Sequence, residues 1–133
     1  MLIAAAACIS YIITGRSWNQ AGCANALWVR QQLPKDEILL QVDGAGTIAY
    51  FSGRNVVNAD GLVGSFDYTE KLFSNRLCQF LQENKIKYLG VSDEDKQWLI
   101  KTDNTVNYKG NSFRVIPFKN YNQQYFLYKI ECD

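Results

Sequence analysis

The first fifteen residues carry no charged side chain, and an apolar run over 2–14 precedes the first charge, Arg16. A helix of this composition has no polar face for water, so it needs a bilayer or a protein core around it. The run is shorter than the roughly 20 residues that cross a bilayer, and no positive segment precedes it as in a signal peptide. Tyr11 and Trp18 suit the membrane interface near its end. We therefore expect residues 1–16 to be the end of a membrane-spanning or anchoring helix whose beginning lies before this sequence.

Two other interpretations of the leader stay open. A helix buried in the core would satisfy the same composition. The sequence Ala5-Ala6-Ala7-Cys8 has the general form of a lipoprotein cleavage box, although Ala5 stands where Leu is usual and the apolar run before it is short.

After Arg16 the composition becomes mixed, and we expect one soluble domain over 17–133. A chain of 133 residues is of single-domain size, and 47% apolar and 20% charged residues are typical of a globular protein. The net charge of +1 and the absence of a basic cluster argue against nucleic acid as a partner.

The chain has no histidine, which excludes Ser-His-Asp, Cys-His and His-based zinc chemistry within it. The four cysteines, Cys8, Cys23, Cys78 and Cys132, form no C-x-x-C pair, so a zinc ribbon or a thioredoxin-type motif is not indicated. We expect buried free thiols, with a disulfide as the alternative if the domain faces an oxidising compartment. No metal site and no cofactor are predicted.

The rest of the chain alternates short apolar runs with helical patterns. Ser17 is the expected cap of a first helix that Pro34 ends. Further helices are predicted over 47–51, 67–82 and from Asp93 to Trp98, and strands over 37–42, 55–59, 86–91, 113–118 and 125–130. Strand, helix, strand, helix, strand implies parallel pairing. The predicted fold is α/β: a three-layer, Rossmann-like, mostly parallel sheet with antiparallel strands at its C-terminal edge, preceded by the end of the transmembrane helix.

The motif with most chemical potential is the turn Asp43-Gly44-Ala45-Gly46 after the first strand. Glycines in such a turn let backbone N–H groups approach a phosphate, and Asp60, after the next strand, would bind a ribose hydroxyl. That hypothesis describes a nucleotide or S-adenosylmethionine transferase. It lacks a third glycine, and Tyr50 would crowd the site. A structural role, with the glycines forming a tight turn and Asp43 capping the next helix, is favoured.

Other polar groups have similar alternatives. Asp43 and Asp60 could form a pair for glycoside chemistry, although each also suits an Asp-Gly turn. The acidic run 93–95 fits a helix start better than a cation site. Three tail aromatics could stack on sugars, but strand packing is favoured for Tyr121, Tyr125 and Tyr128.

Several segments resemble a known family. They are Asp43-Gly44-Ala45-Gly46-Thr47-Ile48-Ala49-Tyr50-Phe51-Ser52, then Val56-Val57-Asn58-Ala59-Asp60-Gly61-Leu62-Val63 with the Tyr68 that follows, and Phe80-Leu81 with Ile86-Lys87-Tyr88-Leu89. Together they resemble the C-terminal extracytoplasmic domain of polytopic bacterial membrane glycosyltransferases, in the superfamily of the dolichyl-phosphate-mannose protein mannosyltransferases. The resemblance covers most of residues 18–130, and it departs from the family pattern at Asn58 and at the extra Gly44.

The resemblance implies a function and a place. The parent would transfer sugar from a polyprenyl-phosphate donor, using an acidic residue that this chain does not contain. This chain would be a non-catalytic module on the periplasmic face of the inner membrane, held through residues 2–14. Its partners would be the rest of the polytopic protein and a glycan or lipid-linked sugar. The alternatives are the transferase above and a membrane-tethered interaction domain. The ligand-binding or turn candidates are Asp43, Gly44, Gly46, Tyr50, Asn58, Asp60, Gly61 and Tyr68, and none is assigned a catalytic role.

Overall fold

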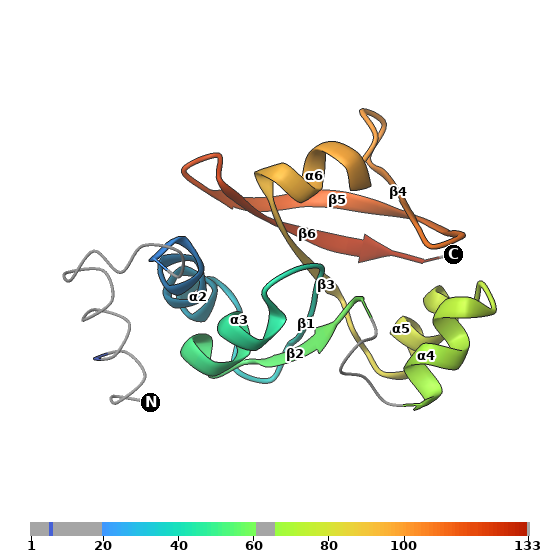
Figure 1. The fold of residues 1–133 in the computed structure, drawn as a ribbon, viewed down its shortest axis with the longest axis horizontal. Coiled ribbons are helices and arrows are strands. Elements are labelled where there is room, and N and C mark those ends of the chain that lie inside the picture. Colours follow the sequence, from blue (N-terminus) through green and yellow to red (C-terminus); the bar gives the residue numbers. More distant parts are fainter. Residues whose placement is uncertain (1–5, 7–19, 61–65, 133) are drawn as a thin grey trace.

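A computed structural model describes residues 6, 20–60 and 66–132 of the chain. The elements follow the order α2 (Gln20–Gln32), β1 (Ile38–Gln41), α3 (Ala45–Ser52), β2 (Asn55–Asn58), α4 (Phe66–Phe73), α5 (Leu77–Glu83), β3 (Tyr88–Ser92), α6 (Asp93–Leu99), β4 (Thr105–Tyr108), β5 (Asn111–Tyr121) and β6 (Tyr125–Glu131) (Figure 1). The predicted leader 2–14 and the predicted cap Ser17 lie outside the described residues, apart from Ala6. Within the described ranges, no helix is both long and apolar enough to cross a membrane.

The six strands form one mixed sheet in the order β2-β1-β3-β6-β5-β4. β1 pairs in parallel with β2 and with β3, as the alternation of strands and helices predicts. The prediction of a mostly parallel, Rossmann-like sheet is nevertheless wrong, because the pairs β3–β6, β6–β5 and β5–β4 are all antiparallel. Short turns join β4 to β5 and β5 to β6, and a short turn can only return the chain antiparallel. β6 also lies inside the sheet against β3, where it was expected near an edge.

The central strands β1, β3 and β6 are covered on both faces, and the side chains of β1 and β6 alternate between these faces, whereas β4 and β5 expose every other side chain over most of their length. One face packs against α4, α5 and α6, and it receives Leu40 and Tyr128. The other packs against α2 and α3, and it receives Leu39 and Leu127. In Figure 1, α2 and α3 lie at one end of the molecule, and α4 and α5 at the other.

The helix predicted over 67–82 is broken into α4 and α5. Between them Asn75 adopts a left-handed conformation, with φ 60°. The side chain of Asn111, from β5, occupies the break: it donates to the carbonyl of Leu72 at 2.9 Å and accepts from the N–H of Leu77 at 3.0 Å. A buried side chain distant in sequence thus replaces helical hydrogen bonds at the junction, which local periodicity does not reveal.

The described cysteines Cys23, Cys78 and Cys132 are oxidised, so the expectation of free thiols is wrong for them. Cys78 at the start of α5 and Cys132 after β6 form a disulfide with a Cα–Cα distance of 5.6 Å. Cys23, buried in α2, is also disulfide-bonded. The Cys78–Cys132 bond holds the end of the chain on the helix layer.

Candidate functional site

A pocket of about 290 Å³ opens at the carboxyl ends of β1 and β3; we call it the strand-end pocket. Parallel strands end at the same edge of a sheet, and the loops that follow them there form a crevice. In this chain the loop after β1 leads into α3, and β3 leads directly into α6. The lining consists mainly of amide, hydroxyl and carboxylate side chains: Asn25, Gln41, Asp43, Thr47, Ser92, Asp95 and Tyr125, with Gly22, Gly44 and Ile48.

The floor of this pocket is a buried hydrogen-bond chain. The hydroxyl of Tyr125, on β6, donates to Oε1 of Gln41 at the end of β1. The amide of Gln41 in turn donates to the carbonyl of Asp43 at 2.7 Å. Burial raises the pKa of the Tyr125 hydroxyl, which keeps it protonated as the donor. These two hydrogen bonds therefore connect β6 to the loop that carries the predicted Asp43 turn.

Gly90 makes this floor possible. It lies on β3 between β1 and β6, opposite Gln41 on one side and Leu127 on the other. A Cβ at this position would overlap both the Tyr125 hydroxyl oxygen and Oε1 of Gln41. Because glycine has no side chain, the space beside Gly90 is open for the hydrogen bond between Tyr125 and Gln41. Neither Gly90 nor Gln41 was among the predicted site residues.

The predicted glycine turn forms one wall of the pocket. Gly44, with φ 67°, is the N-cap residue of α3, and its N–H donates to Oδ1 of Asp43 at 2.8 Å. Asp43 was expected to cap α3, but it makes no such cap and instead closes on Gly44. Gly46 is exposed in the first turn, and a Cβ there would meet nothing, so its position does not require glycine. Tyr50 is 64% exposed on α3, with an edge-to-face contact to Phe51.

The remaining predicted residues form a separate group after β2 that does not line the strand-end pocket. Tyr68 is buried against the carbonyl of Ala59, to which its hydroxyl donates at 2.6 Å. Burial, with smaller contributions from Tyr108 and Asp60, raises the pKa of Tyr68. Oδ1 of Asn58 accepts from the N–H of Asp60 at 3.2 Å. Gly61 lies outside the described residues. The contacts of Asn58 and Tyr68 anchor the end of β2.

The acidic run 93–95 begins α6. Ser92 is its N-cap and accepts from the N–H of Asp95 at 3.2 Å. Oδ1 of Asp95 also accepts from the indole N–H of Trp98 at 3.1 Å, so this carboxylate has structural partners. In the part of the chain that the structure describes, no group of three or more His, Cys, Asp or Glu side chains is placed to hold a metal ion.

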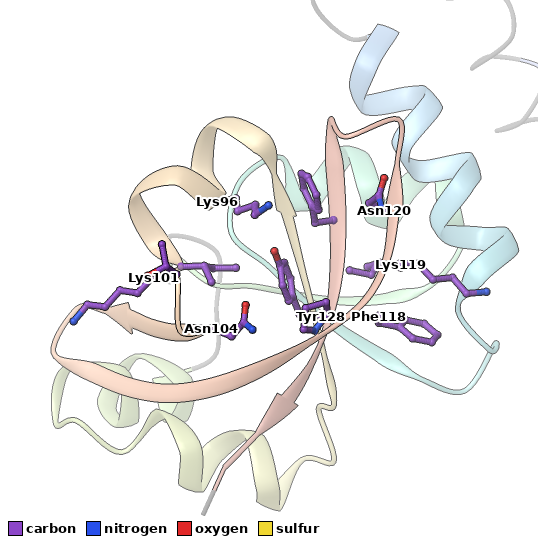
Figure 2. Close-up of a pocket in the computed structure, with 12 residues that line it drawn as sticks. Lys96, Lys101, Asn104, Phe118, Lys119, Asn120 and Tyr128 are labelled. Carbon is purple, nitrogen blue, oxygen red and sulfur yellow. The ribbon is translucent and has the colours of Figure 1, made fainter.

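A second pocket, of about 450 Å³, lies on the other face of the sheet and was not predicted; we call it the lysine pocket. It lies between α6, the loop before β4, and the irregular pairing of β5 with β6 at Pro117/Lys119. Figure 2 shows Tyr128 near its middle and Lys96 directed toward it, while Lys101 and Lys119 flank it with their side chains directed outward. Its residues come from separate elements without a sequence motif: Lys96, Ile100, Lys101, Thr102, Asn104, Pro117, Phe118, Lys119, Asn120, Phe126, Leu127 and Tyr128.

The tail aromatics serve packing, as predicted. Tyr125 and Tyr128 are 1% and 3% exposed. The ring of Tyr121 stacks on Trp28 of α2 with centroids 5.7 Å apart. These rings hold β5 and β6 against the helices on the two faces of the sheet.

Comparison with known proteins identifies a family and shows a distant structural likeness. No curated protein matches the chain. Among solved structures, the C-terminal globular domain of an oligosaccharyltransferase from Archaeoglobus fulgidus is similar with a TM-score of 0.46 and 13% identity, over 81% of this chain and 95% of that one. At that level the likeness carries no argument about activity. A family described as "Domain of unknown function (DUF8728)" matches residues 11–128, and the chain therefore belongs to this family.

Proposed function

We propose that this chain is a non-catalytic, extracytoplasmic domain of a membrane glycosyltransferase that uses a polyprenyl-phosphate sugar donor, and that it holds a sugar in the strand-end pocket. The observation that carries the sugar site is the lining of that pocket. Asn25, Thr47 and Asp43 offer an amide, a hydroxyl and a carboxylate around an opening of about 290 Å³. Sugar hydroxyls both donate and accept hydrogen bonds, and this mixed set can serve both roles. The volume is near the lower limit, about 300 Å³, of small-molecule sites.

The two carboxylates of the pocket support binding in preference to acid–base chemistry. Oδ1 of Asp43 accepts from the N–H of Gly44, and Asp95 accepts from the side chains of Ser92 and Trp98. Each carboxylate therefore orders its own loop or helix start. A general acid or base needs to reach the reacting group of a substrate within hydrogen-bond distance. The resemblance to the glycosyltransferases supports the same division, since it implies that the catalytic acid lies outside this chain.

The disulfide supports the proposed compartment. Disulfides persist in the periplasm and other oxidising spaces and are rare in the cytosol. The Cys78–Cys132 bond, with Cys23 also oxidised, fits a domain on the periplasmic face of the inner membrane. In the proposed arrangement residues 2–14 hold it to the membrane, next to the remainder of a polytopic parent.

The sugar site is tested by titrating the isotope-labelled full chain with glucose, mannose and galactose while its amide resonances are followed by NMR. We expect saturable shifts of Asn25, Thr47 and Ser92 with at least one sugar. Thr47→Val, which removes the hydroxyl and keeps the shape, should weaken binding about five- to tenfold. Thr102→Val, the matched change in the lysine pocket, should leave the affinity unchanged. Absence of saturable shifts with all three sugars would refute the sugar site.

The non-catalytic assignment needs a separate assay. The full chain is incubated with a radiolabelled polyprenyl-phosphate sugar and an acceptor peptide, and transfer of the label is counted. We expect no transfer above the level without protein. Transfer that is lost in Asp43→Asn would contradict the assignment and place catalysis in this domain.

A further inference from the structure

We propose that the lysine pocket binds an organic phosphate, a phosphoryl group carried on a larger apolar or ring-shaped moiety. This proposal does not rest on the sugar site, because the two pockets share no lining residue. It begins from the charge of the pocket. Three lysines line it and no Asp or Glu does. Acidic groups that act on its lining include Asp93, whose charge acts on Tyr128, and Asp103, whose charge interacts with Lys101.

The first donor of the pocket is Lys96, whose side chain is directed toward Tyr128 (Figure 2). Its ammonium nitrogen is 4.0 Å from the centroid of the Phe126 ring. The ion pairs of the described residues are made by Lys71 and Arg76, so the charge of Lys96 is not neutralised by a salt bridge there. A cation over an aromatic face is held in place but keeps N–H groups for an anion.

Tyr128 provides a second donor. It is 3% exposed and lines the pocket, and Figure 2 places it between Lys96 and Asn104. Within the described part of the chain its hydroxyl makes no hydrogen bond, although the ring stacks on Phe126 with centroids 6.4 Å apart. Burial, and then the charge of Asp93, raises the pKa of Tyr128, so the hydroxyl keeps its proton at neutral pH. A protonated phenol is a hydrogen-bond donor for a phosphate oxygen.

Two asparagines complete the set, and the backbone fixes both. The N–H of Asn104 donates to the carbonyl of Lys101, and its own carbonyl accepts from Val115, each at 2.9 Å. Oδ1 of Asn120 accepts from the N–H of Gln123 at 3.2 Å, which leaves the side-chain NH₂ for other partners. Ammonium, phenol and amide donors therefore surround one space, as in sites for phosphate oxygens.

The size and walls of the pocket indicate what carries the phosphate. About 450 Å³ is far more than one phosphoryl group fills, and it lies within the range of sites for whole small molecules, roughly 300–1,000 Å³. Ile100, Pro117 and Phe126 offer apolar surface beside the donors. A phosphate ester on a sugar ring and the phosphate headgroup of a lipid share this chemistry, and the experiment separates them.

The test is an NMR titration of the full chain with glucose 1-phosphate, inorganic phosphate and glucose, together with flotation on phosphatidylglycerol and phosphatidylcholine vesicles. We expect saturable shifts around Phe126 and Tyr128 with glucose 1-phosphate, weaker shifts with phosphate and none with glucose. If the source is a lipid headgroup, we expect instead flotation with phosphatidylglycerol vesicles only. Lys96→Gln should weaken either binding about tenfold or more, and added salt should weaken it further.

Two variants keep the test specific. Tyr128→Phe retains the ring and should weaken binding severalfold, while Lys87→Gln, an equivalent loss of charge outside the pocket, should have no effect. The proposal is overturned if neither glucose 1-phosphate nor phosphatidylglycerol vesicles bind, if inorganic phosphate binds as tightly as glucose 1-phosphate without vesicle binding, or if Lys87→Gln weakens binding as much as Lys96→Gln.

Discussion

Replacing Gly90, which lies inside β3, by alanine should destabilise the protein, although glycine is normally the weaker residue in a strand. The added Cβ overlaps two atoms that are hydrogen-bonded to each other, the Tyr125 hydroxyl and Oε1 of Gln41. Overpacking costs about 1–3 kcal/mol, and loss of a buried hydrogen bond costs about 1–3 kcal/mol more. Alanine restricts the unfolded chain and recovers about 0.4–1 kcal/mol. Combining these ranges gives an expected net loss of about 3 kcal/mol, with limits of about 1 and 5.6 kcal/mol.

The assay is urea unfolding followed by tyrosine and tryptophan fluorescence, with far-ultraviolet circular dichroism as a second probe. Gly90→Ala should lower the midpoint and leave the slope unchanged, because the surface exposed on unfolding is the same. An m-value that falls together with the midpoint would show that the change acts on more than this contact.

A double-mutant cycle identifies the cause. Tyr125→Phe alone leaves Gln41 without its donor and should cost about 1–3 kcal/mol. In the double variant with Gly90→Ala the phenolic oxygen is absent and part of the overlap disappears, so the two losses should fall short of additivity by about 1 kcal/mol or more. Additive losses, or a Gly90→Ala variant within about 0.5 kcal/mol of the parent, would refute the reasoning, since surface changes fall in that range.

Three further predictions concern the stability of the fold outside the two pockets. Replacing Cys78 and Cys132 together by alanine opens a loop of sequence separation 54 and should cost about 4 kcal/mol by loop entropy, measured by urea unfolding of the variant and the parent without reductant; an unchanged midpoint would contradict it. Asn111→Ala leaves the α4–α5 junction without its hydrogen bonds and should cost about 2–4 kcal/mol, whereas Asn107→Ala, on the exposed side of β4, should cost less than about 0.5. Burial raises the pKa of Tyr68, so the stability that its protonated hydroxyl contributes is complete below the unfolded pKa of about 10 and is lost as the pH rises above that value. The free energy of unfolding, measured between about pH 9 and 11.5, should therefore fall less steeply with pH in Tyr68→Phe than in the parent. An equal slope in the two proteins would show that Tyr68 does not cause the loss of stability.

Local patterns in the sequence predicted much of the secondary structure. The apolar runs ending in Asp-Gly or Gly turns are β1 and β2, and the run that ends at Ser92 is β3. These strands are parallel, as the intervening helices required. The prediction succeeded because a buried strand, its turn and its crossover helix are encoded within a few neighbouring residues.

Other features depended on contacts between distant residues. Asn111, more than thirty residues away in β5, holds the break between α4 and α5. The apolar periodicity of the sequence runs on through this break, so it could not predict where the helix ends. β4 (Thr105–Tyr108) was not predicted, since its four residues alternate without a strong apolar signal. The disulfide between Cys78 and Cys132 also depended on the fold, which brings these two thiols together from positions 54 residues apart.

For the candidate sites, the sequence by itself determined the Asp43-Gly44 turn and its position after a buried strand, because turn chemistry is local. Only the tertiary structure decided what lies next to that turn. β6 enters the sheet beside β3, which brings Tyr125 over Gly90 to Gln41 and forms the floor of the strand-end pocket. The same strand carries Tyr128 to the opposite face, where it meets Lys96 from α6 in the lysine pocket. Both pockets therefore follow from the pairing of strands far apart in sequence, which is decided by the burial of two sheet faces at once.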